Sequence, residues 1–219
     1  MQKYQLDKSA LLQFWYEHGV ASERVLRAFE SIPREEFVPT DLRSHAYEDT
    51  PLPLLRGKTI SQPSTVILMT QALEIEPGNK ILEIGTGSGY QLALLARLVG
   101  PRGRVVSCEI IPELVAFAKS NLNRLGIKNV KILEMDGSQG VPDCAPFDRI
   151  ILTAAAPQFP QPLVDQLVED GVILGPVGDM SEQEMVKGIK ENGKLRFNFL
   201  GQFLFTPMLG KNGFSEDSD

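Results

Sequence analysis

Apolar residues in the first third of the chain recur at helical spacing in three stretches. "SALLQFWYEHG", which begins at Ser9, and "SERVLRAFESI", which begins at Ser22, carry them three and four positions apart, with each serine placed as an N-cap. "PSTVILMTQALEI" follows, and its Pro63 suits the first turn of a helix. Residues 33–62 are proline-rich and lack this period, which predicts a long functional loop or lid.

The pattern changes after Lys80, where short apolar strands alternate with helical stretches. The strands include "KILEIG", "FDRIILTA" and "GVILGPV", and the helical stretches include "YQLALLARLV" and "QPLVDQLV". Such alternation predicts a doubly wound α/β fold, Rossmann-like, whose mostly parallel sheet has helices on both faces. In 182–209 apolar and polar residues alternate around an "NG" turn, which predicts an antiparallel hairpin at the sheet edge. We expect N-terminal helices and a lid-like arm in 1–62, a core in 63–210 and a disordered acidic tail in 211–219.

Composition narrows the classes of function. The 219 residues are 42% hydrophobic and 23% charged, with a net charge of −6, as expected of one globular domain. No apolar run could span a bilayer and no signal peptide is visible, so we expect a cytoplasmic protein without a membrane partner. The sequence lacks the basic stripe that is typical of nucleic-acid-binding proteins, so we expect no nucleic-acid partner. Cys108 and Cys144 lack metal-site spacing, and two histidines are too few to favour a Ser-His-Asp hydrolase.

The letters "GKT" at 57–59 are those that close a phosphate-binding P-loop. That loop needs a second glycine five positions earlier, where this chain has Leu52. The preceding "YEDTPLPLL" contains two prolines and no glycine, so it offers no nest of backbone N–H groups for phosphates. We therefore reject a P-loop.

The most informative stretch is "LEIGTGSGY", where glycines follow a strand and open a helix, a context in which ligands approach bare backbone. A dinucleotide site would want a further glycine where Tyr90 stands. The G-x-G-x-G spacing, preceded by Glu83, instead resembles motif I of S-adenosylmethionine-dependent methyltransferases. The next two strands end in Glu109, suited to ribose hydroxyls, and Asp136, suited to an adenine amino group. The alternatives are a tight turn without ligand, solvated carboxylates or turn formers. The predicted donor-binding residues are Glu83, Gly85, Thr86, Gly87, Gly89, Glu109, Asp136 and Gly137.

From about residue 20 to 209 the chain resembles the protein-L-isoaspartate O-methyltransferases. The resemblance rests on "TISQP" ahead of "LEIGTGSGYQ", with "PREEFVP", "YEDTPLP", "MDGSQG", "FDRIILTAAAPQFP" and "LVEDGVILGPVG". It implies methyl transfer from S-adenosylmethionine to the free carboxylate of isoaspartyl residues in damaged proteins and peptides, which initiates repair; no metal or oligomer is implied. It also makes Ser61 the active-site residue and Thr59, Ser61 and Thr206 substrate contacts.

The chain departs from the family at three positions: Leu55 replaces a glycine, Lys58 a glutamine and Thr206 an apolar residue. A backbone role at 206 would survive the change, whereas the loop geometry around 55 is open. Retuning for another carboxylate and a non-catalytic binding module therefore remain as alternatives.

The chemistry agrees with the low histidine content. An α-carboxylate that is exposed to water has a pKa of about 3.3 to 3.7, so the nucleophile is already ionised and needs no general base. Catalysis then depends on placing the oxygen in line with the methyl group and on excluding water, for which 33–62 is the candidate lid. Ser61 would hold the substrate carboxylate or the donor's amino-acid end. Its alternative role is a hydroxyl at the start of the helix at Pro63.

Overall fold

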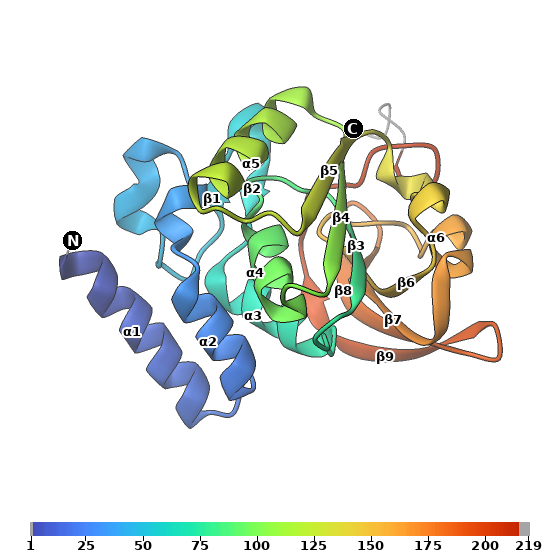
Figure 1. Cartoon of the computed structure of the whole chain (residues 1–219), viewed down its shortest axis with the longest axis horizontal. Coiled ribbons are helices and arrows are strands. Elements are labelled where there is room, and N and C mark those ends of the chain that lie inside the picture. The colour runs from blue at the N-terminus through green and yellow to red at the C-terminus, as the bar shows by residue number, and fades with distance from the viewer. Residues whose placement is uncertain (1, 215–219) are drawn as a thin grey trace.

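A seven-stranded sheet in the order β5-β4-β3-β6-β7-β8-β9 is the centre of the fold (Figure 1). The computed structural model describes residues 2–214, with the side chains of 2–7 left aside. Strands β3 to β7 pair in parallel, whereas β8 and β9 are antiparallel. The strands are β3 (Lys80–Ile84), β4 (Arg104–Glu109), β5 (Val130–Glu134), β6 (Phe147–Leu152), β7 (Leu167–Gly178), β8 (Gln183–Glu191) and β9 (Lys194–Phe203).

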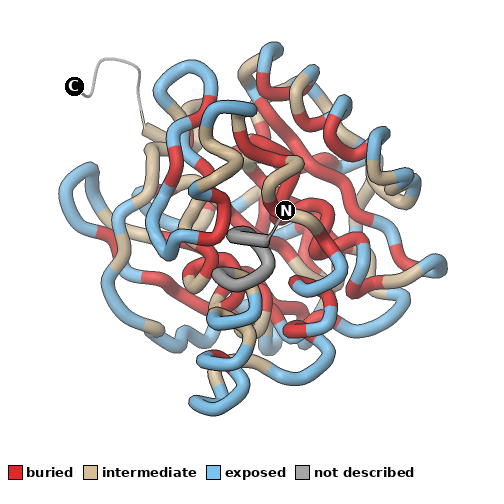
Figure 2. The backbone as a smooth tube through the Cα atoms, turned by 90° about the vertical axis from the view of Figure 1, so that its left-hand side faces the viewer, coloured by how far each residue is buried: buried red, intermediate tan, exposed pale blue. Residues whose placement is uncertain are grey.

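The helices form two layers around this sheet. Five of them, α1 to α5, lie on one side, where α3, α4 and α5 pack against the strands and α1 and α2 lie outside; α6 lies on the other side (Figure 1). Buried backbone fills the interior and exposed loops surround it (Figure 2). The helices are α1 (Gln2–Glu17), α2 (Glu23–Ser31), α3 (Pro63–Ala72), α4 (Tyr90–Val99), α5 (Pro112–Arg124) and α6 (Gln161–Asp165).

The expected fold class is confirmed. Strand β3 lies between β4 and β6: the chain runs outward from β3 to β4 and β5 and then crosses back to β6 on the other side of β3. The strand ends at such a reversal are where doubly wound sheets bind ligands. The C-terminal hairpin is present as β8 and β9, with Asn192 and Gly193 in the turn. Both turn residues have positive φ, as a two-residue hairpin turn requires.

Two predicted boundaries are wrong. Helix α1 begins at Gln2, so Ser9 lies inside it rather than at its N-cap; no Gly or Pro in 2–8 stops the helix earlier. The helix predicted from "QPLVDQLV" ends at Asp165, because Leu167 already pairs with Phe147 as the first residue of β7. Ser22 does stand at the N-cap of α2, although its side chain makes no capping hydrogen bond.

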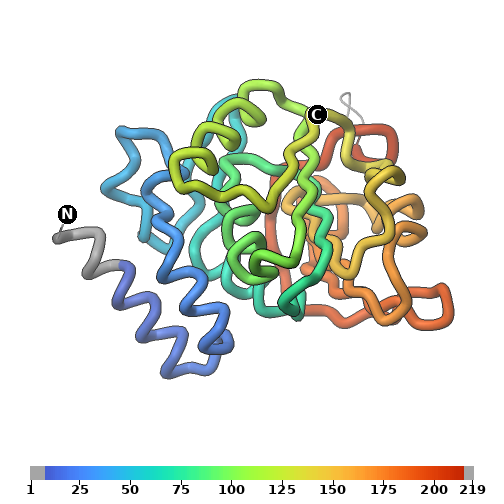
Figure 3. The backbone as a smooth tube through the Cα atoms, in the orientation of Figure 1, coloured from blue at the N-terminus to red at the C-terminus, as the bar shows by residue number. Residues whose placement is uncertain are grey.

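The arm, residues 33–62, is built from short regular elements. They are the 3₁₀ turns η1 (Arg34–Phe37), η2 (Thr40–His45) and η3 (Leu55–Gly57) and the paired strands β1 (Leu52–Pro53) and β2 (Thr59–Ile60). In Figure 3 this light-blue segment lies at the upper left, above the N-terminal helices. Residue Arg34, which is 0% exposed, holds it together: Nε donates to the Ala46 carbonyl and Nη2 to the Ser61 carbonyl, both at 2.7 Å.

The end of the described chain folds back on the core. The backbone N–H of Lys211 donates to Asp136 (2.9 Å) and that of Asn212 to Ser138 Oγ (3.0 Å), so ordered chain continues to Phe214. The rest of the predicted tail, 215–219, lies outside the described residues. Over the part of the chain that is described, none of the helices has the length and apolar character needed to cross a bilayer.

Candidate active site

The glycine motif forms a loop, 85–89, between β3 and α4, which we call the donor loop. Gly85 and Gly87 adopt φ of 96° and 54°, a region that side chains disfavour. A side-chain carbon on Gly85 would lie 2.6 Å from Thr153 Oγ1, whereas one on Gly87 would meet only Leu54, at 4.0 Å. Gly85 is therefore required by packing, while Gly87 presents bare backbone toward open space.

Glu109 at the end of β4 fixes this loop from one side. The Gly87 N–H donates to Glu109 Oε2 (2.9 Å), and Oε1 accepts from the N–H groups of Ile110 (2.9 Å) and Ile111 (3.0 Å). A carboxylate offers about four lone-pair sites, so at least one remains for a ligand hydroxyl. The carboxylate is thus oriented by the backbone before any ligand arrives.

Glu83 lies beneath the loop and is 0% exposed. Ser107 Oγ donates to Glu83 Oε2 (2.5 Å) and lies 2.6 Å from Thr86 Oγ1, so a chain of hydroxyls joins Glu83 to the donor loop. Burial raises the pKa of Glu83 to about 8, with Ser107 opposing and Glu109 adding to the shift. This acid supports the loop from below and is largely protonated at neutral pH.

The arm supplies the facing wall of the site through residues 58–61. Helix α3 does not use Ser61 as a cap: its N-cap is Gln62, and the N–H of Ser64 in its first turn donates to Asp49 Oδ1 (2.8 Å). The Ser61 hydroxyl makes no hydrogen bond to any other residue that the structure describes, while its carbonyl is held by Arg34. A positioned backbone therefore carries a hydroxyl free to bind a ligand.

These two walls border a pocket whose empty space, counted out into the solvent at its mouth, is about 980 Å³. We call the part lined by 85–88 and Glu109 the donor side and the part lined by 58–61 the arm side. The predicted residues that line the pocket are Thr59, Ser61, Gly85, Thr86, Gly87, Glu109, Gly137 and Thr206.

Three predicted donor-binding residues do not line it. Glu83 lies under the loop, and Gly89 begins α4, where an added side chain would press on Ala118 at 3.2 Å. Asp136 is a turn former at the start of Gly137–Gln139: its Oδ1 accepts from the Ser138 N–H (2.8 Å) and its Oδ2 from Lys211. Burial pushes the pKa of Asp136 upward, but these hydrogen bonds outweigh it and lower that pKa.

Other lining residues were missed in the sequence. They come from β2, from the donor loop, from α3, α4 and α5, from the ends of β3 to β6 and from the segment that follows β9. The signal for Thr153 and Ala154 was their position directly after β6; most of the others are apolar and look like core residues. They are Ile60, Val66, Met69, Ile84, Ser88, Tyr90, Gln91, Cys108, Ile110, Ile111, Leu114, Met135, Thr153, Ala154, Pro207, Met208 and Leu209, with Lys58 at the arm side.

The three departures from the family pattern have different consequences. Leu55 does not have a positive φ; Arg56 has (57°), and its guanidinium pairs with Glu113 of α5, so the loop closes without a glycine at 55. Lys58 lines the pocket and makes no ion pair with a described residue. The Thr206 carbonyl accepts from the Ala155 N–H (2.9 Å), a backbone contact that is independent of the side chain.

The site suits a nucleoside-bearing cation better than a dinucleotide. Bare backbone at Gly87 allows close approach, and Glu109 offers a ribose acceptor. Tyr90 is 1% exposed and fixed between Phe37 (5.4 Å between ring centroids) and the Arg34 guanidinium (5.0 Å), so no pyrophosphate could use its position. The residues present therefore fit S-adenosylmethionine.

Comparison with known proteins gives a consistent result. A family model described as protein-L-isoaspartate(D-aspartate) O-methyltransferase matches residues 6–213. Proteins named protein-L-isoaspartate O-methyltransferase are similar to this chain: one from Methanocella arvoryzae is 52% identical over 84% of this chain and 98% of its own length, and one from Methanopyrus kandleri is 48% identical over 90% and 88%.

Solved structures agree. A structure named protein-L-isoaspartate O-methyltransferase has a TM-score of 0.83 and 33% identity and covers 94% of this chain and 66% of its own. A beta-aspartate methyltransferase of Plasmodium falciparum, solved in complex with S-adenosyl-L-homocysteine, has a TM-score of 0.80 and 26% identity over 91% of this chain and 97% of its own.

Proposed function

The chain belongs to the protein-L-isoaspartate O-methyltransferase family, and we propose that its pocket holds the donor at the donor side and the isoaspartyl carboxylate at the arm side. The enzyme is an S-adenosylmethionine-dependent protein carboxyl O-methyltransferase that acts on isoaspartyl residues of damaged proteins. What we propose is which residues bind the donor and the substrate. We also propose a cytoplasmic location, which cell fractionation would test.

We assign donor binding to 85–88 and Glu109 and carboxylate placement to Ser61. When bound, S-adenosylmethionine supplies an activated methyl group on a cationic sulfur. Glu109 accepts from the ribose, and the exposed backbone of Gly87 allows the donor to lie against the loop. The Ser61 hydroxyl donates to the substrate carboxylate and orients one oxygen for attack. Because that carboxylate is ionised at neutral pH, no residue has to remove a proton.

The observation that carries the assignment is the state of the Ser61 hydroxyl. Ser61 could instead have capped α3, but Asp49 accepts the hydrogen bond from the first turn of that helix. The backbone of Ser61 is anchored by Arg34. Thr59 and Thr206 also line the pocket and are assigned to the peptide around the carboxylate. A hydroxyl that is held in place and has no hydrogen-bond partner among the described residues is ready to bind an anionic ligand.

The decisive experiment compares matched isoaspartyl and aspartyl peptides with labelled donor, counting base-labile methyl ester. We expect label only in the isoaspartyl peptide. Equal labelling of both peptides would favour an enzyme retuned by Lys58 for another carboxylate, and labelling of neither, with donor binding intact, would favour a binding module.

A further inference from the structure

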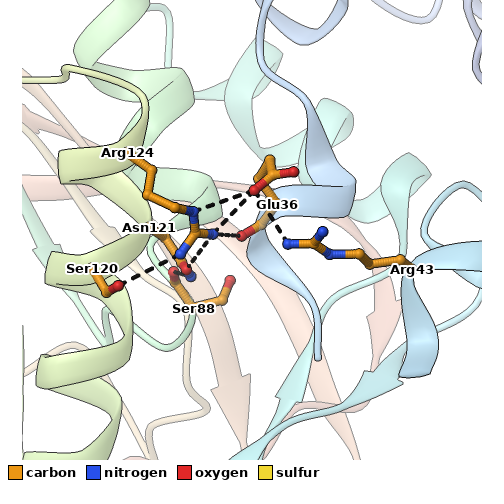
Figure 4. A network of polar contacts seen from close by, with 6 residues as sticks. All are labelled: Glu36, Arg43, Ser88, Ser120, Asn121 and Arg124. Atoms are coloured by element: carbon orange, nitrogen blue, oxygen red, sulfur yellow. Dashed lines mark hydrogen bonds and ion pairs between the residues drawn. The ribbon is translucent and has the colours of Figure 1, made fainter. Parts of the chain in front are cut away.

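Asn121 of α5 is a polar side chain that is 0% exposed and touches the donor loop. Its Nδ2 donates to the Ser88 carbonyl (2.9 Å) and its Oδ1 accepts from Arg124 Nη2 (3.0 Å), as Figure 4 shows. Both ends of the amide are thus engaged, which fixes its orientation. A buried amide placed in this way specifies the position of the carbonyl that it binds.

The bound carbonyl belongs to the peptide group that determines how the donor loop turns into α4. The Gly89 N–H of the same peptide donates to the Thr86 carbonyl (2.8 Å), so this group is held at both its oxygen and its nitrogen. Glu109 holds the Gly87 N–H from the other side. The segment 86–89 is therefore held from β4 by Glu109 and Ser107 and from α5 by Asn121. Of these three side chains only Glu109 also lines the pocket.

Arg124 extends this connection to the arm. Its Nη2 also donates to the Glu36 carbonyl (2.7 Å), and its guanidinium pairs with the Glu36 carboxylate (3.2 Å), which in turn pairs with Arg43 (3.3 Å). Glu36 lies in η1, two residues after Arg34, which anchors the Ser61 carbonyl. A continuous set of contacts thus runs from the donor loop through α5 to the arm (Figure 4).

We propose that Asn121 is a positioning residue for donor binding. We also propose that Arg124 makes the affinity for the donor depend on the position of the arm relative to α5. This inference rests on the assignment of the donor and arm sides above. Neither side chain lines the pocket. Asn121 acts by holding the Ser88 carbonyl, and Arg124 by joining Asn121 to Glu36, so donor and peptide binding are coupled through one set of contacts.

The first test is Asn121→Asp, which keeps the shape of the side chain but removes the donor to the Ser88 carbonyl. We expect the Kd for S-adenosylhomocysteine, measured by calorimetry, to rise about tenfold or more, because a buried carbonyl loses its partner. The KM for the donor should rise in parallel, with kcat at saturating donor nearly unchanged.

Asn129→Asp is the matched control. Asn129 Nδ2 donates to the carbonyls of Ala96 (2.9 Å) and Gly100 (3.1 Å) at the other end of α4, far along the chain from the donor loop. It should lose comparable stability in denaturant while the Kd stays within about twofold of wild type. If both variants weaken the donor equally, or if Asn121→Asp loses stability alone, Asn121 has only a structural role and the proposal is wrong.

The second test is Arg124→Gln, which removes the contacts with Glu36. We expect a higher KM for the isoaspartyl peptide and a donor Kd raised about two- to fivefold, with effects in the double variant with Asn121→Asp that are less than additive. Strict additivity would separate Arg124 from Asn121 and overturn the coupling. The wild-type protein is measured alongside: if it binds S-adenosylhomocysteine but methylates no peptide, the assigned function fails and not this inference.

Discussion

The donor side and the arm side of the pocket are built in different ways. The donor side follows two adjacent parallel strands, whose register fixes Glu83 and Glu109 at 0% and 7% exposure. The arm side lies outside that sheet, on a two-stranded pair with only two residue pairs, Leu52 with Ile60 and Pro53 with Thr59. The arm is held by buried apolar residues such as Phe37 and by the guanidinium of Arg34. One wall is thus part of the main sheet, while the other is a separate segment packed against the core.

This difference suggests a division of labour. Backbone held by a sheet ladder is preorganised, so it can contribute binding energy without first being ordered. The arm side lacks an extended ladder, so we expect its backbone to adapt more readily to peptides of different sequence around the same carboxylate. Changes at the donor side should therefore affect donor binding most, and changes at the arm side should affect turnover of peptide.

The largest effect is expected for Gly87→Val. A β-branched side chain at φ 54° should destabilise the fold by about 1–2 kcal/mol, yet nothing nearer than 4.0 Å obstructs it, so the fold should survive. The side chain would occupy the space of the donor, and binding of S-adenosylhomocysteine should be lost. Gly126→Val is the control, because Gly126 also has positive φ (66°) and open space but lies outside the pocket. Equal donor binding in both variants would contradict the donor-side assignment.

A smaller effect is expected for Ser61→Ala at the arm side. Loss of one hydrogen bond to a charged group should cost about 1.5–3 kcal/mol, or about ten- to a hundredfold in kcat/KM for the peptide. The donor Kd should remain within about twofold, since Ser61 is assigned to the substrate carboxylate and not to the donor. If donor affinity fell as much as turnover, the two sides would not be separate in function.

Glu83, beneath the donor side, should make the free energy of unfolding depend on pH. Its pKa in the fold is raised from the ordinary 4.5 to about 8, so folding favours the protonated form. The stability that this gives is complete below about pH 4.5 and is lost as pH rises through 8. Between pH 6 and 9 the free energy of unfolding in urea should fall for wild type and stay flatter for Glu83→Gln. Parallel curves for the two proteins would mean that Glu83 is ionised in the fold.

The smallest effect is expected for Lys58→Gln, which restores the residue typical of the family. Lys58 is only half-buried at the pocket, so we expect its ammonium to remain solvated and the KM for the isoaspartyl peptide to stay within about twofold. A KM that rises in the variant, and in wild type with added salt, would show instead that the ammonium reaches the carboxylate.

The predictions from the sequence agree best with the structure where the signal for an element lies within one short segment. The strand, glycine loop and helix around Gly85 and Gly87 were predictable because their signals lie within one short segment. The roles of Glu83 and Asp136 were not, because an acid at a strand end can point into the pocket, beneath it or toward another segment. That choice depended on Ser107 and on Lys211, which lie 24 and 75 positions away along the chain.

The amino-acid sequence by itself determined the fold class, the donor loop and the family, since hydrophobic period, glycine spacing and the "TISQP" motif are properties of short segments. Only the tertiary structure decided that Asp49, and not Ser61, accepts from the first turn of α3, that Asp136 turns toward the C-terminal segment, and that Asn121 binds the donor loop. These are contacts between residues distant in the chain, and their partners are chosen by packing and by the need of buried polar groups for hydrogen bonds.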